Sequence, residues 1–339
     1  MDVVVCGAQK PFMSGGAEQH QANLVEALRE AGHRSELVRL PVAWERGRLF
    51  NCALAWRLTP IDADLVIATN FPSYFVRHPN KVVWLFHQHR AAYDGAAAGA
   101  DWSDFDLHDE ALEDQRLLAE WDNVALAEAV RLFTTSGVVA DRLARYNGLT
   151  GEPLAHPPPL ADRLRQGEFG DYVLSVSRFA SNKRPGLLVE ALAHSHSDVR
   201  AVLAGTGDLY DEVARRAAGL GVAERVELAG FVPDDDLVEL LAGALAVVYA
   251  PLDEDYGYVT LQSFYAGKPV ITAADSGGVL EWVRDGVTGL VTDGTPAGMG
   301  AALDRLAGDR ELARRLGAAG RQRVADLSWR PAVERLVGR

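Results

Sequence analysis

The sequence predicts an α/β protein made of two doubly wound, Rossmann-like domains that face a cleft. The chain of 339 residues with 48% hydrophobic content is too long for one ordinary core and has enough apolar material for two. Short β-rich runs alternate with amphipathic helical stretches, which is typical of a mostly parallel sheet covered on both faces. Between the halves, consecutive prolines in EPLAHPPPLADRLRQGEFG exclude a regular helix or an inner strand and indicate a linker.

The first half contains a series of strand-like runs and one clear helix. The helix is expected near 16–31, after a Gly-Gly loop and before Gly32. The strand runs are DVVVCG, SELVRL, DLVIAT, KVVWLF and RLFTTS. The second half repeats the alternation with the runs DYVLSVSRF, VRAVLAGTG, RVELAGFV, LAVVYAP, KPVITAA and TGLVTD. Its helices are expected near 186–194, 208–220, 235–243, 278–285 and 301–325.

These elements predict four segments along the chain. The N-terminal Rossmann-like domain is expected over 1–157, a Pro-rich hinge over 158–165 and the C-terminal Rossmann-like domain over 166–318. The remaining helical tail, 319–339, is expected to pack back onto the first domain. In such sheets ligands bind beyond the carboxyl ends of the strands, so the residues that follow the strands are the candidates for a site.

Composition and charge exclude several classes of protein. The formal net charge of −13 leaves no general electrostatic hold on nucleic acid, although a local contact with a membrane surface stays open. Cys6 and Cys52 lack metal-ligand spacing and are expected as reduced thiols, which suits a cytoplasmic protein. The chain starts almost directly with a strand, so we expect no signal peptide, and no run approaches a membrane span.

Two groups of residues follow the first strand of each half. Gly15 and Gly16 precede a helix, so unhindered backbone and helix N–H groups could approach a negative charge. Taken alone the pair is a weak signal, and a plain tight turn is the commoner reason for paired glycines before a helix. Arg178 and Lys183 follow DYVLSVSRF and combine a planar guanidinium with a mobile ammonium, a pairing suited to a diphosphate. Surface charges at a helix entrance are the alternative explanation.

The stretch LAGTGDL could be mistaken for a dinucleotide fingerprint. It carries Gly205 and Gly207, but Tyr210 stands where the third glycine belongs. A nicotinamide cofactor is therefore not favoured.

The stretch EDYGYVTLQ admits two interpretations. With Asp253 before it, it could be an acid-x-acid site for Mg²⁺. Equally, the amides of Gly257, Tyr258 and Val259 could bind an anion, with Glu254 accepting hydrogen bonds from hydroxyl groups. Given Arg178 and Lys183, a phosphate would then need no metal.

Together these motifs resemble family 4 of the retaining glycosyltransferases, which have the GT-B fold. The resemblance rests on the Gly15–Gly16 loop, Arg178 with Lys183, LAGTGDL, GFV at 230–232, EDYGYVTLQSFYAGKPVIT and DSGGVLEWVRDGVTGLV. It implies a donor side in the C-terminal domain and an acceptor side in the N-terminal domain, with domain closure pivoting at the hinge. It also implies transfer of a sugar from a nucleotide diphosphate sugar to a saccharide or natural-product acceptor, with retention at the anomeric carbon and without a cofactor or metal.

The resemblance assigns roles to individual positions. Arg178 and Lys183 would bind the donor diphosphate, Glu254 the donor sugar, Gly257 would lie close to the phosphates, and segment 230–232 would border the base. The expected catalytic residues are His87, Arg178, Lys183 and Glu254. The expected donor-binding residues are Gly15, Gly16, Gly205, Phe231, Val232, Gly257, Tyr258, Val259 and Gln262, and the expected acceptor residues are His89, Arg90 and Trp102.

Gln262 departs from the family pattern, in which a second glutamate contacts the nucleotide ribose. A carboxylate accepts from both ribose hydroxyls, whereas Gln offers one acceptor oxygen and a donating amide. We expect a weaker donor hold, by about 1–2 kcal/mol, and a lower donor KM when Glu is restored. A rearranged ribose contact and a poorly active protein are the alternatives.

Other interpretations stay open at this point. A GT-B sugar-nucleotide epimerase and a non-catalytic sugar-nucleotide binder share the architecture. The acidic segment 101–122 is either a solvated helix face or a surface that attracts a cationic acceptor, and lipid-linked saccharides are a competing acceptor class.

Overall fold

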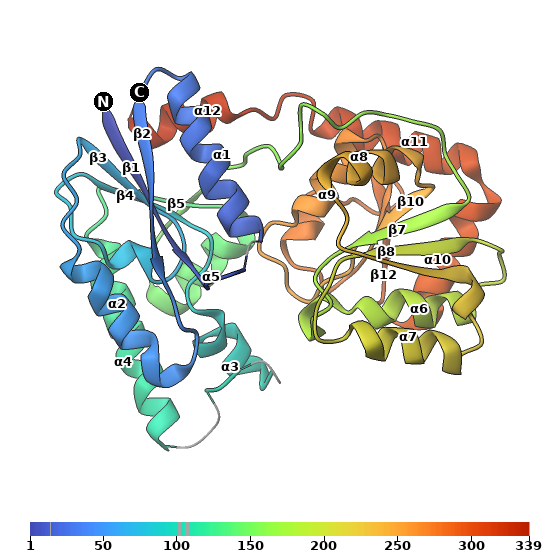
Figure 1. Cartoon of the computed structure of the whole chain (residues 1–339), viewed down its shortest axis with the longest axis horizontal. Helices are drawn as coiled ribbons and strands as arrows, with labels where there is room; N and C mark the ends of the chain where they lie inside the picture. Colours follow the sequence, from blue (N-terminus) through green and yellow to red (C-terminus); the bar gives the residue numbers. More distant parts are fainter. Residues whose placement is uncertain (14, 101–102, 106–108, 339) are drawn as a thin grey trace. The chain divides into compact units, whose positions relative to one another are not determined.

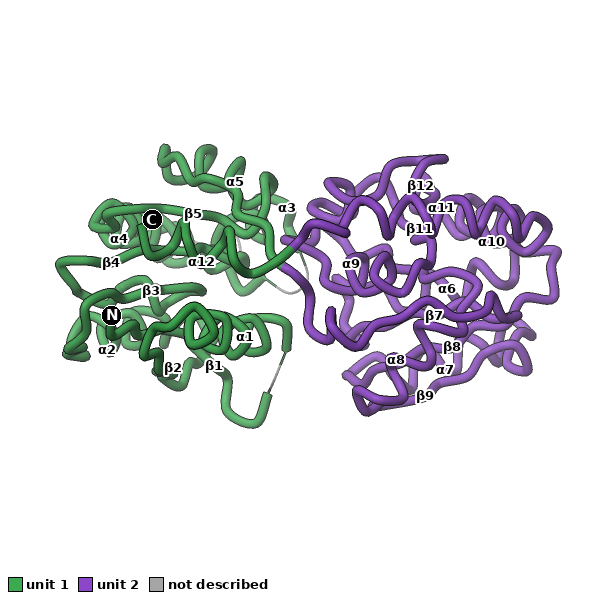
Figure 2. Tube along the Cα trace, turned by 90° about the horizontal axis from the view of Figure 1, so that it is seen from above, with its two compact units in different colours: residues 1–156, 328–339 green, residues 157–327 purple. Residues whose placement is uncertain are grey.

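The chain forms two compact units in the computed structural model, which describes residues 1–13, 15–100, 103–105 and 109–338. Unit 1 combines Met1–His156 with the C-terminal segment Ser328–Arg339, and unit 2 comprises Pro157–Leu327, as the two colours of Figure 2 show. The chain therefore enters unit 2 after His156 and returns to unit 1 at Ser328.

Unit 1 is built on a six-stranded parallel sheet in the order β2-β1-β3-β4-β5-β6. Its strands are β1 (Asp2–Gln9), β2 (Arg34–Pro41), β3 (Leu65–Ala68), β4 (Lys81–Leu85), β5 (Arg131–Thr134) and β6 (Glu152–Pro153). Pro153 lacks an N–H group and is tolerated because β6 is an edge strand. The strand order reverses at β1, where doubly wound sheets bind ligands.

Helices cover both faces of this sheet. One face packs on α1 (Gly16–Glu30) and α12 (Trp329–Val337) around Trp84. The other packs on α2 (Leu49–Leu58), α4 (Asp109–Ala127) and α5 (Gly137–Asn147). The shorter elements of unit 1 are α3 (Asp94–Ala98), η1 (Arg46–Arg48), η2 (Ser73–Phe75) and η3 (Arg90–Ala92).

The C-terminal helix α12 completes unit 1. The Trp329 ring lies 6.1 Å from Trp84 and 5.3 Å from His156, centroid to centroid, and 5.4 Å from His20 on α1. These contacts of the half-buried Trp329 attach the last helix to a sheet made from the first half of the sequence.

Unit 2 has a second six-stranded parallel sheet, in the order β12-β11-β10-β7-β8-β9. Its strands are β7 (Tyr172–Val176), β8 (Arg200–Ala204), β9 (Val226–Gly230), β10 (Ala246–Val248), β11 (Val270–Ala273) and β12 (Gly289–Thr292). The order reverses between β7 and β10, so the loops after these two strands flank the position at which ligands bind in such sheets.

The helices of unit 2 also lie on both faces of their sheet (Figure 1). One core contains residues of α6 (Pro185–His194), α7 (Tyr210–Gly219), α10 (Pro296–Gly308) and α11 (Arg310–Arg323). The other contains residues of α8 (Asp234–Gly243) and α9 (Tyr258–Tyr265). The predicted fold class, two doubly wound Rossmann-like domains, is confirmed. Among the described helices, none combines the length and apolar character that a membrane crossing needs.

Two predicted helices of unit 2 were wrong in their bounds. The segment 278–285 forms only a short 3-10 turn, η6 (Gly278–Glu281), because its start is bonded to the loop that carries Glu254. The segment 301–325 is divided between α10 and α11 at Asp309, whose carboxylate accepts a hydrogen bond from the Leu312 N–H (2.9 Å) and so begins a new helix. Two further 3-10 turns, η4 (Ser181–Lys183) and η5 (Ala223–Arg225), complete the unit.

Candidate functional site

The predicted residues of unit 2 gather at the carboxyl edge of its sheet. Arg178 and Lys183 follow β7, and Glu254 follows β10, which is paired with β7 in parallel. Carboxyl ends of parallel strands meet at one edge, so these residues flank the point where the strand order reverses.

Glu254 is held by two side chains through one of its oxygens. Lys183 Nζ forms an ion pair with Glu254 Oε2, and the Tyr249 hydroxyl donates to the same oxygen (2.8 Å). Glu254 Oε1 has no hydrogen-bond partner among the described residues. A carboxylate fixed through one oxygen keeps the other as an acceptor for a hydroxyl group of a ligand.

The charge state of Glu254 follows from this arrangement. Burial by itself raises the pKa of the Glu254 carboxyl, but the positive charge of Lys183 and the hydrogen bonds from Lys183 and Tyr249 outweigh burial and lower it. Burial raises the pKa of Tyr249 well above its usual range, and the neighbouring Glu254 adds to that effect. The site therefore presents an ionised carboxylate beside a protonated phenol at neutral pH.

The Glu254 backbone is clamped against the loop after β11. The Glu254 N–H donates to Ser276 O (3.3 Å), and Glu254 O accepts from the Gly278 N–H (2.7 Å). Gly277 has a φ of 58°, and a Cβ on it would lie 2.6 Å from Glu254 O. No side chain fits there, so the DSGG stretch that begins at Asp275 requires its first glycine.

Gly277→Ala should therefore destabilise the protein more than a left-handed conformation alone requires. The strain of a positive φ costs about 1–2 kcal/mol, and the backbone clash adds about 1–3 kcal/mol. Gly286→Ala is the matched control, because Gly286 has a φ of 68° but no heavy atom within 4 Å of where its Cβ would stand. Urea unfolding of both variants measures the difference. An equal loss of unfolding free energy in the two variants would mean that the loop after β11 rearranges to accept the added methyl group at no energetic cost.

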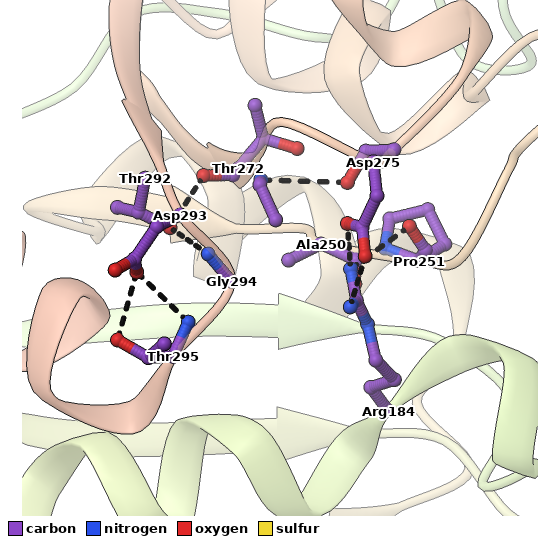
Figure 3. Close-up of polar contacts among 11 residues, drawn as sticks. Arg184, Ala250, Pro251, Thr272, Asp275, Thr292, Asp293, Gly294 and Thr295 are labelled. Carbon is purple, nitrogen blue, oxygen red and sulfur yellow. Dashed lines mark hydrogen bonds and ion pairs between the residues drawn. The ribbon is translucent and has the colours of Figure 1, made fainter.

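Arg184 contacts Ala250 and Pro251, which lie in the chain between β10 and Glu254, and it also contacts Asp275 (Figure 3). Its guanidinium donates to Ala250 O (2.8 Å) and Pro251 O (3.3 Å). The same group makes a two-pronged ion pair with Asp275 (2.6 and 2.8 Å). Sequence reasoning missed Arg184, although it stands next to Lys183, because nothing in the sequence indicates that its side chain turns toward β10.

Two glycines in the loop after β8 pack closely against the backbone on either side of Arg178. A Cβ on Gly205 would lie 1.8 Å from Ser177 O, and one on Gly207 would lie 2.5 Å from Phe179 O. The loop after β8 can approach the chain on both sides of Arg178 only because these residues are glycines. Arg178 itself is exposed and makes no ion pair or hydrogen bond with a described residue. Its charge nevertheless acts on Tyr249, whose pKa it lowers against the stronger effects of burial and Glu254.

Helix α9 follows the loop that carries Glu254, and its N-terminus is suited to bind an anion. Gly257 caps the helix in the left-handed conformation (φ 83°), and a Cβ there would lie 3.0 Å from Val279 Cγ2. The first N–H groups of the helix, those of Tyr258 and Val259, can bind negative charge. Thr260 Oγ1 is buried and without a partner among the described residues, 3.5 Å from where a Gly257 Cβ would stand.

Gln262 lies one turn farther along α9 and is 7% exposed. Its amide Nε2 donates to Pro159 O (3.3 Å), in the Pro-rich segment at the start of unit 2. The bond uses the donor that distinguishes Gln from Glu, and leaves Oε1 as an acceptor.

Phe231 and Val232, expected near a nucleotide base, follow β9. They line a pocket of about 450 Å³ together with Ala229, Asp236 and Leu240. Phe231 is 80% exposed, so an apolar face is available to a flat ligand.

The unit 1 residues form a separate set. Gly15 caps α1 and donates its N–H to Glu18 Oε2 (2.8 Å), and Gly16 is the first residue of the helix. His87, after β4, is half-buried, with Nδ1 donating to Gln88 O (2.6 Å).

The expected acceptor residues are less accessible than the sequence suggested. His89 is buried and stacks on Trp44 with the ring centroids 5.7 Å apart; burial lowers its pKa to about 4. Arg90 is engaged by Asp94, its guanidinium lying 2.6 Å from Asp94 Oδ2. Trp102 lies outside the described residues. Within the described ranges, no group of three or more His, Cys, Asp or Glu side chains is arranged to hold a metal.

Residues 163–323 match the family described as glycosyl transferases group 1. This segment contains Arg178, Lys183, Glu254 and Gln262, so the family match covers the unit 2 site. This segment of the chain is therefore similar to the group 1 glycosyltransferases.

Curated relatives agree with the family match. The D-inositol 3-phosphate glycosyltransferase of Nocardia farcinica is 32% identical over 237 residues, which cover 62% of this chain and 52% of that protein. The lipopolysaccharide core biosynthesis glycosyltransferase LpsE of Rhizobium meliloti is 32% identical over 163 residues, covering 48% of this chain and 46% of LpsE. The chain thus spans about half the length of these curated relatives.

Solved structures match the fold of this chain over nearly its full length. Sucrose-phosphate synthase from Thermosynechococcus elongatus has a TM-score of 0.79 at 18% identity, with 99% of this chain and 97% of that chain covered. The Anabaena protein HepE in complex with UDP and glucose has a TM-score of 0.75 at 15% identity, with 100% and 98% covered. The shared architecture is the GT-B fold.

Proposed function

We propose that the protein is a retaining glycosyltransferase of family 4 that moves a sugar from a nucleotide diphosphate sugar to a saccharide or natural-product acceptor. One observation carries the proposal: Glu254, fixed through Oε2 and open at Oε1, stands at the same sheet edge as Arg178 and Lys183. The carboxylate is suited to bind the hydroxyl groups of a sugar, and the two cations are suited to bind a diphosphate. A sugar and a diphosphate are two parts of such a donor. The family match and the glycosyltransferase names of the relatives agree with it.

The proposed reaction needs no protein nucleophile. The bond between the anomeric carbon and the diphosphate oxygen breaks, and its electron pair stays on the diphosphate. The acceptor oxygen bonds to the same face of the anomeric carbon, and its proton passes to the departing phosphate oxygen. Arg178, Lys183 and the first amides of α9 would stabilise the developing negative charge, and positioning of both reactants supplies much of the rate.

The proposal includes neither a metal nor an organic cofactor. The negative charge of the diphosphate would be met by the two cations after β7 and by the start of α9, which leaves Asp253 and Asp255 outside the reaction. An activity that survives dialysis against EDTA is the expected result.

Gln262→Glu is expected to lower the donor KM modestly. The carboxylate would form a charge-assisted bond with a ribose hydroxyl, worth about 1.5–3 kcal/mol, and would lose the neutral bond to Pro159 O, worth about 0.5–1.5 kcal/mol. Steady-state kinetics at varied donor concentration measure the donor KM, which reports the difference between the bond gained and the bond lost. Gln262→Met, which removes both polar functions, should raise the KM. An unchanged or higher KM in Gln262→Glu would contradict the ribose contact.

The experiment that tests the proposed function is incubation with a panel of nucleotide sugars and acceptors. Released nucleoside diphosphate, a product heavier by one sugar, and an anomeric coupling constant that matches the donor would support it. Conversion of the donor without any acceptor would identify an epimerase instead. Selective donor binding without turnover under every acceptor would identify a non-catalytic binder.

The acceptor is proposed only as a class. The acidic segment that includes α4 would attract an amino-sugar compound. Acidic residues of this segment can be replaced by the corresponding amides. A higher KM for the acceptor, with an unchanged KM for the donor, would support a cationic acceptor over a lipid-linked saccharide.

A further inference from the structure

Tyr249 joins the elements of the unit 2 site without belonging to any of the expected motifs. It directly follows β10 and is buried, with its hydroxyl 2.8 Å from Glu254 Oε2. Lys183 Nζ reaches the same oxygen and lies 6.0 Å from the centroid of the Tyr249 ring. The phenol therefore contacts the carboxylate with its hydroxyl and faces the ammonium with its ring.

The proposed function gives Lys183 two partners. In the structure its ammonium neutralises Glu254, whereas a bound donor would offer it a diphosphate that carries more negative charge. A lysine side chain is flexible and can turn from one partner to the other. Glu254 would then lose its ion pair at the moment when its free oxygen has to meet the donor sugar.

Tyr249 cannot follow Lys183. Its ring is buried at the end of an inner strand and lies beside Gly257, where a Cβ would be 3.5 Å from Tyr249 Cε1. Its pKa, raised well above the usual range by burial, keeps the hydroxyl protonated and able to donate. The bond to Glu254 Oε2 can therefore persist whichever partner Lys183 takes.

We propose that Tyr249 is a positioning residue that holds Glu254 through Oε2 while Lys183 turns to the donor diphosphate, so that Oε1 stays aimed at the donor sugar. This inference rests on the proposed function. The charged and titratable groups that act on the pair are Lys183 and Asp255 at Glu254, and Arg178 and Asp255 at Tyr249.

Tyr249→Phe tests this role, with Tyr265→Phe as the matched control. Tyr265 lies on α9 in the same unit, and its hydroxyl makes one bond, to Leu327 O (3.0 Å). Tyr249→Phe should lower kcat about tenfold with a donor KM changed less than about threefold, because the bond matters most once Lys183 has left. Tyr265→Phe should retain wild-type kinetics.

The pH profile separates positioning from general packing. The Tyr249 bond favours the ionised Glu254, so its loss raises the pKa of Glu254. The acidic limb of kcat against pH should move to higher pH in Tyr249→Phe and stay in place in Tyr265→Phe. Wild-type kcat in Tyr249→Phe, an unmoved acidic limb, or the same loss in Tyr265→Phe would overturn the proposal.

A measurement without substrate keeps this test independent of the proposed function. In Lys183→Met protein, which imitates a lysine turned away, the Glu254 carboxyl can be titrated by ¹³C NMR with and without Tyr249→Phe. A higher Glu254 pKa in the double variant supports the proposal, and equal values overturn it. If wild-type protein turns over no nucleotide sugar, the proposed function fails while this titration still decides whether Tyr249 holds Glu254.

Discussion

Glu254→Gln should lower kcat about 100-fold while the protein stays folded. The amide keeps the shape of the side chain but cannot accept a charge-assisted bond from a sugar hydroxyl, a loss of about 1.5–3 kcal/mol. It also leaves Lys183 without the carboxylate with which it is paired. Steady-state kinetics with the identified donor and acceptor measure the effect.

Glu190→Gln is a suitable control for that experiment. Glu190 forms an ion pair of its own, 2.6 Å from Arg216 Nη1, in the same unit but on helix α6. Its replacement should leave kcat within about twofold, because partly exposed ion pairs contribute little. A wild-type kcat in Glu254→Gln, or an equal loss of kcat in both variants, would show that Glu254 takes no specific part in the reaction.

Arg178→Ala and Lys183→Ala should both weaken donor binding but differ in stability. Each removes a cation expected at the diphosphate, so the donor KM should rise about 10- to 100-fold in either variant. Arg178 is exposed and has no ion-pair partner among the described residues, so its loss should leave the unfolding free energy unchanged. Lys183 neutralises Glu254, whose side chain is 16% exposed, so its loss should also destabilise the fold by about 1–3 kcal/mol.

The stability difference has a pH signature. Lys183 lowers the pKa of Glu254 below its unfolded value, so the pair stabilises the fold above that value and loses this contribution as the pH falls through the lowered pKa. Lys183→Ala should therefore be less stable than wild type at pH 7, with the gap closing as the solution becomes acidic. Urea unfolding at several pH values checks this. A gap independent of pH would mean that Lys183 stabilises the protein by packing and not by its charge.

The sequence predicted every described strand except β6, because each of the others is a short apolar run bounded by polar or glycine residues. Arg178, Lys183 and Glu254 could be chosen in advance because they immediately follow such runs, and parallel strands place their carboxyl ends at one edge. The glycines of LAGTGDL could also be singled out in the sequence, but their role in packing could not be predicted. Only the structure shows that Gly205 and Gly207 admit the backbone on both sides of Arg178.

Contacts between distant side chains could not be predicted. Nothing in LAVVYAP indicates that the Tyr249 hydroxyl turns back to Glu254, or that Arg184 reaches the carbonyl groups of Ala250 and Pro251. The bond from Gln262 to Pro159 joins residues 103 positions apart, so the sequence gives no reason for it. The helix expected near 278–285 failed for the same reason, because a long-range backbone contact overrides local helical preference.

Unit 2 should bind a nucleotide diphosphate sugar through Arg178 and Lys183, and the thermal stability of the protein with and without ligand measures this binding. UDP, GDP, ADP and dTDP, each with and without its common sugars, would be added to wild-type protein and to Arg178→Ala. At a hundredfold excess over Kd, a bound ligand stabilises the fold by about 2.7 kcal/mol. The Tm of the wild-type protein should increase selectively with the nucleotides of one base, and the increase should be smaller in Arg178→Ala. Folded wild-type protein that none of these ligands stabilises, or an equal increase in Arg178→Ala, would contradict it.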